Sequence, residues 1–239
     1  MNILITGGAS GLGEAITRKL AKDPKNIIYF TFNSSLLNAK LIESEFKNTV
    51  AVKCDFKNLE EINLLQKIIE TIDLDVLINN AYSGNPIKNY FHKSDLNDFI
   101  SEFNINITPT ILITQSAIRK FRKRKGGKII TILTSFLHST QPIGSSSYVA
   151  GKAYLKSLAK SWSTENIKFN ITSNSISPSF MQTNLTTDVD GRIIEKMIED
   201  HPLKSLLKVE EVAETVSFLT KVSLQVNGID IIINAGTHV

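Results

Sequence analysis

The stretch Ile3-Leu4-Ile5-Thr6-Gly7-Gly8-Ala9-Ser10-Gly11-Leu12-Gly13 decides the fold. A short apolar run leads into a glycine-rich turn and then into the helical pattern of residues 14–20. Gly7 can make the tight turn, Gly11 lets backbone N–H groups approach a diphosphate, and Gly13 lets the helix pack close to the strand. The helix N-terminus then presents its partial positive charge to the phosphates. The stretch predicts a strand-turn-helix unit that binds a nucleotide, although a purely structural turn has the same pattern.

Apolar runs alternate with helical patterns along the rest of the chain, which indicates βαβ units and a parallel sheet buried on both faces. The predicted fold class is α/β, a single-domain doubly wound seven-stranded parallel sheet (a Rossmann fold) over residues 1–239. The expected strands are 2–6, 27–32, 49–53, 74–79, 128–134, 169–176 and 229–233. Ligands bind outside the carboxyl ends of such strands. Five candidate residues fall there: Gly7, Asp55, Asn79, Ser135 and Pro178.

Composition fits one compact core, with 42% hydrophobic and 21% charged residues in 239. The single cysteine, Cys54, excludes an intramolecular disulfide. No signal peptide and no apolar stretch of membrane-spanning length are visible, so we expect a cytoplasmic protein. A net charge of +4 does not demand nucleic acid. No metal site is expected, since the histidines have no ligand spacing: His92, His138, His201 and His238.

The segment Tyr148-Val149-Ala150-Gly151-Lys152 is the most informative about chemistry. On a helix, Tyr148 and Lys152 stand on one face, one turn apart. A nearby cation favours phenolate and lowers the tyrosine pKa from about 10 toward working pH, which makes a usable general acid and base. The spacing alone occurs by chance in many helices, so the residues around it decide its weight.

The Thr-Gly-x-x-x-Gly-x-Gly spacing at Thr6–Gly13, taken with Ser135, Tyr148 and Lys152, resembles the short-chain dehydrogenase/reductase family. The resemblance covers essentially the whole chain, and it is closest to the 3-oxoacyl-carrier-protein reductase branch. Further segments in the family's order are Asn79-Asn80-Ala81, Asn106 ahead of 112–115, Pro178 with Thr183, 201–213 and 227–236. The chain departs from the family pattern at four positions, where Tyr82, Ser179 and Ala235 replace glycines and Asn234 replaces an aspartate. The ring of Tyr82 must point away from the cofactor or narrow the site.

The resemblance implies roles for four catalytic residues. A carbonyl that accepts hydride develops negative charge on oxygen, so it needs a donor to polarise it and an acid to protonate it. Ser135 would be the donor and Tyr148 the acid. Lys152 would lower the Tyr148 pKa and bind the nicotinamide ribose, and Asn106 would hold a water that links Lys152 to solvent. Singly, Ser135 is also explained as a strand-end turn residue, Asn106 as a helix-bend residue and Lys152 as a solvated lysine.

The cofactor is expected to be NADP(H) rather than NAD(H). No carboxylate follows the second strand to repel a 2′-phosphate, and Asn33, Ser34 and Ser35 can donate hydrogen bonds to it. No arginine stands there, however, and Ser10 occupies a glycine-loop position that is basic in many NADPH-using members. Asp55 resembles the residue that contacts adenine, and it can also cap the helix that follows. The predicted cofactor-binding residues are Gly7, Ser10, Gly11, Leu12, Gly13, Asn33, Ser34, Ser35, Asp55, Phe56, Asn80, Ala81, Tyr148, Lys152, Pro178 and Thr183.

The substrate is where the sequence is least informative. A 3-oxoacyl thioester on an acyl carrier protein is favoured, while sugar, polyol and small-alcohol dehydrogenases share the same features. A non-catalytic nucleotide-binding regulator is a further alternative. Substrate is expected to contact Phe136, His138 and Phe180, under a mobile lid at 180–200 that carries Thr183, Thr186, Thr187 and Gly191.

Two expectations concern partners. The basic run 119–125 can dock an acidic carrier protein, or it can be a solvated helix end whose cations complement the helix dipole. Nucleic-acid binding is a third interpretation. The helices expected at 95–121 and 147–164 carry more apolar positions than one sheet face absorbs, which predicts a homo-oligomer, in this family a homotetramer.

Overall fold

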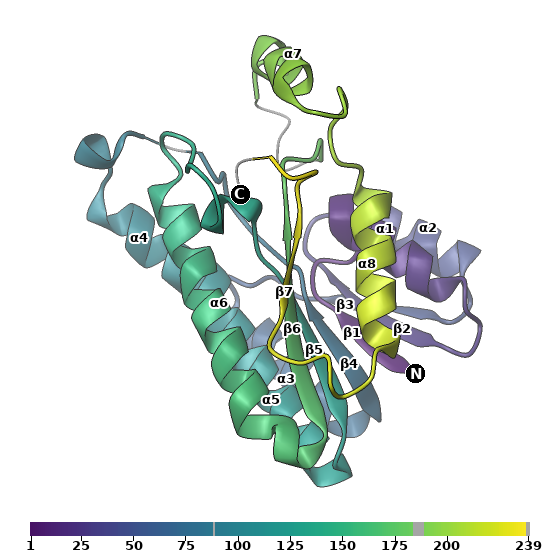
Figure 1. Ribbon diagram of the computed structural model, residues 1–239. Helices are drawn as coiled ribbons and strands as arrows, with labels where there is room; N and C mark the ends of the chain where they lie inside the picture. Colours follow the sequence, from purple (N-terminus) through teal and green to yellow (C-terminus); the bar gives the residue numbers. More distant parts are fainter. Residues whose placement is uncertain (88, 184–188, 238–239) are drawn as a thin grey trace.

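The computed structural model describes residues 1–87, 89–183 and 189–237. Its centre is one parallel sheet of seven strands in the order β3-β2-β1-β4-β5-β6-β7 (Figure 1). The predicted fold class is confirmed. The strands are β1 Asn2–Ile5, β2 Ile27–Phe32, β3 Thr49–Lys53, β4 Leu74–Asn79, β5 Gly127–Ile132, β6 Ile171–Pro178 and β7 Asp230–Ile233.

The direction of winding reverses between β1 and β4. The chain steps outward from β1 through β2 to β3, and then returns to pair β4 with the other side of β1. Ile5 of β1 is in register with Phe30 on one side and with Ile78 on the other. In an open α/β sheet, the crevice at such a switch point is the ligand site.

Two helical layers cover the sheet (Figure 1). A core on one face packs the first and last helices together against the strands, with side chains such as Ile16, Ile42 and Val216. The helices on this face are α1 Gly11–Ala21, α2 Leu36–Glu45 and α8 Val209–Lys221. The second core contains Leu65, Phe121 and Trp162. It belongs to α3 Leu59–Thr71, α5 Thr108–Arg124 and α6 Ser146–Asn166.

The helix expected at 95–121 is divided in two. It consists of α4 Leu96–Glu102 and α5, joined by a π-helical turn at Phe103–Ile107. Asn106 is buried in that turn. A π-turn inserts an extra residue into the helix, and such insertions are frequent at functional sites.

The basic run 119–125 lies where α5 leads into Gly127, the first residue of β5, and hence at the amino edge of the sheet. Several of its side chains bind the protein's own groups. Arg124 pairs with Asp75 at 2.8 Å, and Arg122 Nε donates to Asn166 Oδ1 at 2.7 Å. The carboxyl ends of the strands lie at the opposite edge. This position favours the helix-end interpretation of the run.

The remaining helix, α7 Gly191–Asp200, stands above the carboxyl ends of the strands (Figure 1). None of its residues is buried. Thr186 and Thr187, assigned to the lid, lie outside the described residues, as does His238. Within residues 1–87, 89–183 and 189–237, no helix has the length and apolarity needed to cross a membrane.

Candidate active site

A cavity of about 770 Å³ opens at the carboxyl ends of the strands. Every residue predicted to bind the cofactor lies on its wall, and so do Phe136 and Phe180 from the predicted substrate set. Val189, Ile193 and Met197, from α7 and the segment before it, close the outer side. Residues that are remote in sequence therefore meet in one space large enough for a dinucleotide and a small substrate.

The glycine turn brings β1, α1 and β4 into contact. Gly7 has a φ of +67°, and a Cβ there would lie 2.9 Å from the Cα of Ala81. A Cβ on Gly13 would lie 2.0 Å from the Gly7 carbonyl oxygen, so only glycine fits. The Thr6 hydroxyl accepts hydrogen bonds from the backbone N–H groups of Asn80 and Ala81, both at 3.0 Å. These contacts join the two strands that flank the switch point.

The N-terminus of α1 faces this cavity without a side-chain cap. Ser10 is the N-cap residue, and its side chain makes no capping hydrogen bond. Gly11 has a φ of +51°. The first N–H groups of a helix have no intrahelical partner, and together with the helix dipole they form an anion site. The diphosphate of a dinucleotide fits this turn.

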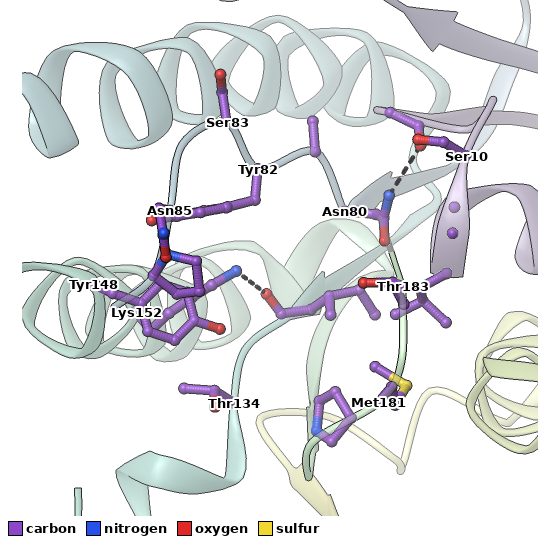
Figure 2. Close-up of a pocket in the computed structure, with 18 of the residues that line it drawn as sticks. Ser10, Asn80, Tyr82, Ser83, Asn85, Thr134, Tyr148, Lys152, Met181 and Thr183 are labelled. Carbon is purple, nitrogen blue, oxygen red and sulfur yellow. Dashed lines mark hydrogen bonds between the residues drawn. The ribbon is translucent and has the colours of Figure 1, made fainter. Parts of the chain in front are cut away.

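Tyr148 and Lys152 lie together on α6 at the inner wall (Figure 2). Lys152 Nζ donates a hydrogen bond to the Ile132 carbonyl at 2.9 Å and lies 5.8 Å from the centre of the Tyr148 ring. Burial lowers the pKa of Lys152 to about 8, against a raising effect of Glu102. Burial also raises the pKa of Tyr148 to about 12, which the Thr134 hydroxyl opposes and Glu102 reinforces. Desolvation therefore raises the Tyr148 pKa, in contrast to the expected lowering by Lys152.

Thr134, the neighbour of the predicted donor Ser135, contacts Tyr148 in this structure. The Thr134 hydroxyl hydrogen-bonds Tyr148 and lines the cavity, below the Tyr148 ring in Figure 2. Ser135 is 5% exposed, begins a 3₁₀ turn at Ser135–Leu137, and is not among the cavity-lining residues. The sequence spacing could not determine which of the two neighbouring hydroxyls faces the cavity.

Asn106 holds a loop with its side chain. Its Oδ1 accepts from the backbone N–H of Ser83 at 2.9 Å, and its Nδ2 donates to the Ser83 carbonyl at 3.0 Å. Ser83 follows Tyr82 and lines the cavity. Both polar atoms of the Asn106 side chain therefore bind the backbone of the segment after β4 and hold that segment in place.

His138 lies outside the cavity wall, in contrast to the expectation that it meets substrate. Its Nε2 is 2.8 Å from Asp230 Oδ2 and 3.0 Å from Lys156 Nζ. Ser177 Oγ also donates to Asp230 Oδ1 at 2.9 Å. These contacts connect β6, β7 and α6. They hold the His138 imidazole outside the cavity wall.

The second strand ends in a polar corner with a cation that the sequence analysis missed. Lys53 Nζ, at the end of β3, donates to Asn33 Oδ1 at 2.9 Å and pairs with Glu61 at 3.3 Å. Lys53 and Asn33 are neighbours only because β2 and β3 pair in parallel. The helix-capping role suggested for Asp55 belongs to Asn58, whose Oδ1 accepts from Glu60 N at 2.9 Å.

The family model described as short chain dehydrogenase matches residues 1–193. This chain belongs to the short-chain dehydrogenase family. A 3-oxoacyl-[acyl-carrier-protein] reductase FabG of Aquifex aeolicus is 32% identical over 241 residues, which cover 98% of this chain and 95% of the relative. Carbonyl reductase family member 4 of Xenopus laevis is 29% identical, with 97% and 95% covered. The solved acetoin dehydrogenase YohF of Salmonella typhimurium has a TM-score of 0.85 at 25% identity, with 98% and 94% covered.

As a member of this family, the protein is an oxidoreductase that uses a nicotinamide cofactor and a small-molecule substrate. The uncapped N-terminus of α1 and the glycine turn, where a Cβ would clash, can accommodate the diphosphate of that cofactor.

Proposed function

We propose that this protein is an NADP(H)-dependent carbonyl reductase that acts on a 3-oxoacyl thioester. The observation that carries the reaction type is the placement of Tyr148, Lys152 and Thr134 on one wall of the cavity that also holds the glycine turn. The substrate class is supported by the names of relatives such as the 3-oxoacyl-[acyl-carrier-protein] reductase of Aquifex aeolicus. We treat residues 1–239 as one domain, and a cytoplasmic location stays a prediction.

When bound, the reduced nicotinamide supplies the hydride. Thr134 then donates a hydrogen bond to the substrate carbonyl oxygen, which polarises the bond and stabilises the developing negative charge. As the hydride reaches the carbonyl carbon, the π electron pair moves onto oxygen and Tyr148 transfers its phenolic proton there. Lys152 stabilises the phenolate that is left and offers its ammonium to the ribose hydroxyls. The product is the secondary alcohol.

A high pKa suits Tyr148 to reduction. At neutral pH a group with a pKa of about 12 carries its proton, so it starts as the acid that the developing alkoxide needs. Lys152 is mostly charged below its pKa of about 8 and loses that charge as the pH rises through this value. Reduction is therefore expected to decline above about pH 8 as the ammonium is lost.

The preference for NADP(H) is supported by the polar corner after β2. Asn33, Ser34 and Ser35 line the cavity. Lys53, whose Nζ lies 2.9 Å from Asn33 Oδ1, adds the positive charge for a 2′-phosphate. Its present partner is Glu61 at 3.3 Å, and its side chain is half exposed, so the ammonium is free to turn toward a phosphate. Titration of the protein with NADPH and NADH, followed by fluorescence, tests the preference.

A small-alcohol dehydrogenase is the second candidate, because an acetoin dehydrogenase is among the similar structures. Phe136, Ile143 and Phe180 on the substrate side favour an apolar acyl chain over a polyhydroxylated sugar. The deciding experiment is turnover on matched 3-oxoacyl thioesters, acetoin, simple ketones and ketoses. A preference for acetoin of tenfold or more in kcat/KM would contradict the thioester proposal.

A homotetramer is proposed from the surface of α4 and α6. Leu96, Ile100, Phe103 and Tyr154 are all exposed there, and the rings of Phe103 and Tyr154 meet edge to face at 5.3 Å. Adjacent apolar side chains of this size on a protein surface favour association. Multi-angle light scattering at micromolar concentration should give four times the chain mass, and Phe103→Glu should reduce it. A monomeric wild-type protein would contradict the proposal.

A further inference from the structure

A buried carboxylate lies beside Tyr148 and Lys152. Glu102, the last residue of α4, is 7% exposed and accepts a hydrogen bond from the Tyr82 hydroxyl at 3.0 Å. Removing a carboxylate from water is costly, so a protein interior holds one only where partners stabilise it. The donor here is the side chain that replaces a glycine of the family pattern.

The ring of Tyr82 is packed into the reaction centre. It meets the Tyr148 ring edge to face, with centroids 5.1 Å apart and an interplanar angle of 85°. Lys152 Nζ lies 5.6 Å from the Tyr82 ring centre and 5.8 Å from that of Tyr148, and thus next to both faces. Figure 2 shows Tyr82 entering from the loop after β4, on the side of the cavity opposite Thr134. An ammonium at this distance from aromatic rings is stabilised by them.

Gly151 makes room for the carboxylate. A Cβ at Gly151 would lie 3.1 Å from Glu102 Oε1 and 3.3 Å from its Cγ. Gly151 occupies the helical turn between Tyr148 and Lys152, where glycine costs about 0.5–1 kcal/mol relative to alanine. The missing side chain lets the carboxylate approach the turn that carries both functional groups.

Resting on the proposed function, we propose that Tyr82 and Glu102 are positioning residues of this reaction centre. Tyr82 holds the Glu102 carboxylate against the turn of α6 that carries Tyr148 and Lys152. The negative charge held there sets the upper pH limit of carbonyl reduction.

The charges around Glu102 determine the sign of the effect. Tyr82 faces it from the loop after β4, and Tyr148 and Lys152 come from α6. The π-turn contributes only Phe, Asn and Ile, and on α4 itself Asp98 lies one turn earlier. A carboxylate disfavours phenolate and favours ammonium. Glu102 accordingly raises the pKa of Tyr148 and that of Lys152, so both groups keep their protons to higher pH.

The test is the pH profile of kcat for reduction in Glu102→Gln. The amide oxygen still accepts from Tyr82, so the geometry is kept while the charge is removed. Both protons are then lost at lower pH, and the basic limb should move down by about one unit, which lowers the ratio of activity at about pH 9 to that at about pH 7 by about fivefold. Glu165→Gln is the matched control, because it removes an exposed charge from α6 about 25 Å along the helix from Tyr148. Its profile should superimpose on wild type.

Two further variants distinguish positioning from simple stability. In a Tyr82→Phe background, which keeps the ring but removes the donor, the shift caused by Glu102→Gln should shrink by at least half. If Glu102→Gln does not fold, Gly151→Ala replaces it and should shift the limb in the same direction by crowding the carboxylate. Superimposed profiles of the folded variants, with only a lower melting temperature, would overturn the proposal.

A readout that needs no substrate separates this inference from the proposed function. Tyrosinate absorbance, titrated in wild type and in Glu102→Gln, should show Tyr148 and Tyr82 ionising at lower pH in the variant, because Glu102 raises the pKa of both. The part of the change that comes from Tyr148 should vanish when Tyr148→Phe is added. If no carbonyl is reduced but this titration shifts, the proposed function is contradicted, while the effect of Glu102 on the reaction centre is supported. An unchanged titration overturns the proposed effect of Glu102.

Discussion

Replacing Thr134 by valine should abolish most of the activity while leaving the fold intact. Valine has nearly the shape of threonine, so the variant removes the hydroxyl from a residue that is 4% exposed without opening a cavity. That hydroxyl hydrogen-bonds Tyr148 and faces the space where the substrate carbonyl must lie. Loss of one donor to a developing oxyanion costs about 10² to 10³ in kcat, or about 2.7–4 kcal/mol.

The same change has a small cost in stability. The Thr134 hydroxyl also accepts from the backbone N–H of Phe136, at a long 3.3 Å, where it caps the 3₁₀ turn. Loss of a weak cap costs about 0.5–1 kcal/mol. For a domain of this size such a loss lowers the melting temperature by about 1–4 °C. The activity and stability effects therefore differ in magnitude and can be separated.

The assay compares kcat for carbonyl reduction in three variants, with thermal unfolding and NADPH binding measured on each. Thr134→Val should lose about 10²-fold or more, while Thr134→Ser, which keeps the hydroxyl, should stay within about tenfold of wild type. Ser135→Ala should retain most activity, because Ser135 is buried away from the cavity wall. The reasoning is refuted if Ser135→Ala loses the activity and Thr134→Val keeps it.

Three other substitutions have definite expected outcomes. Tyr148→Phe should keep cofactor binding and lose about 10² to 10⁴ in turnover, as measured by single-turnover kinetics, and retained turnover would contradict its role as the acid. Gly13→Ala should abolish NADPH binding in fluorescence titration, because its Cβ would fall 2.0 Å from the Gly7 carbonyl oxygen. Lys53→Met should weaken binding of NADPH more than that of NADH, and an equal loss for both would mean that Lys53 does not meet a 2′-phosphate.

The local sequence was sufficient to predict the sheet and the cofactor cavity. Alternating apolar runs and helical patterns identified all seven strands, with ends that differ by a few residues at most. Strand ends in a parallel sheet meet at one edge, so the residues that follow them could be grouped before the structure was known. The glycine turn could also be predicted from the sequence, because φ values of +67° and +51° at Gly7 and Gly11 suit glycine best.

Side-chain direction and burial could not be predicted in this way. The choice between Thr134 and Ser135 depends on how β5 ends and on the 3₁₀ turn that follows it. The raised pKa of Tyr148 depends on desolvation by segments far away in the sequence. The position of the basic run, at the sheet edge remote from the cavity, required the strand order.

The sequence by itself determined the doubly wound sheet, the glycine cradle and the Tyr148–Lys152 turn, because each depends on local periodicity or on backbone geometry that few residue types adopt. Only the tertiary structure decided that Tyr82 reaches Glu102, that Gly151 admits its carboxylate, and that Thr134 faces Tyr148. These contacts join the β4 loop, α4, the end of β5 and α6, which become neighbours only when the sheet and its helices pack. Their energies depend on removal from water, which is a property of the assembled fold and not of any one segment.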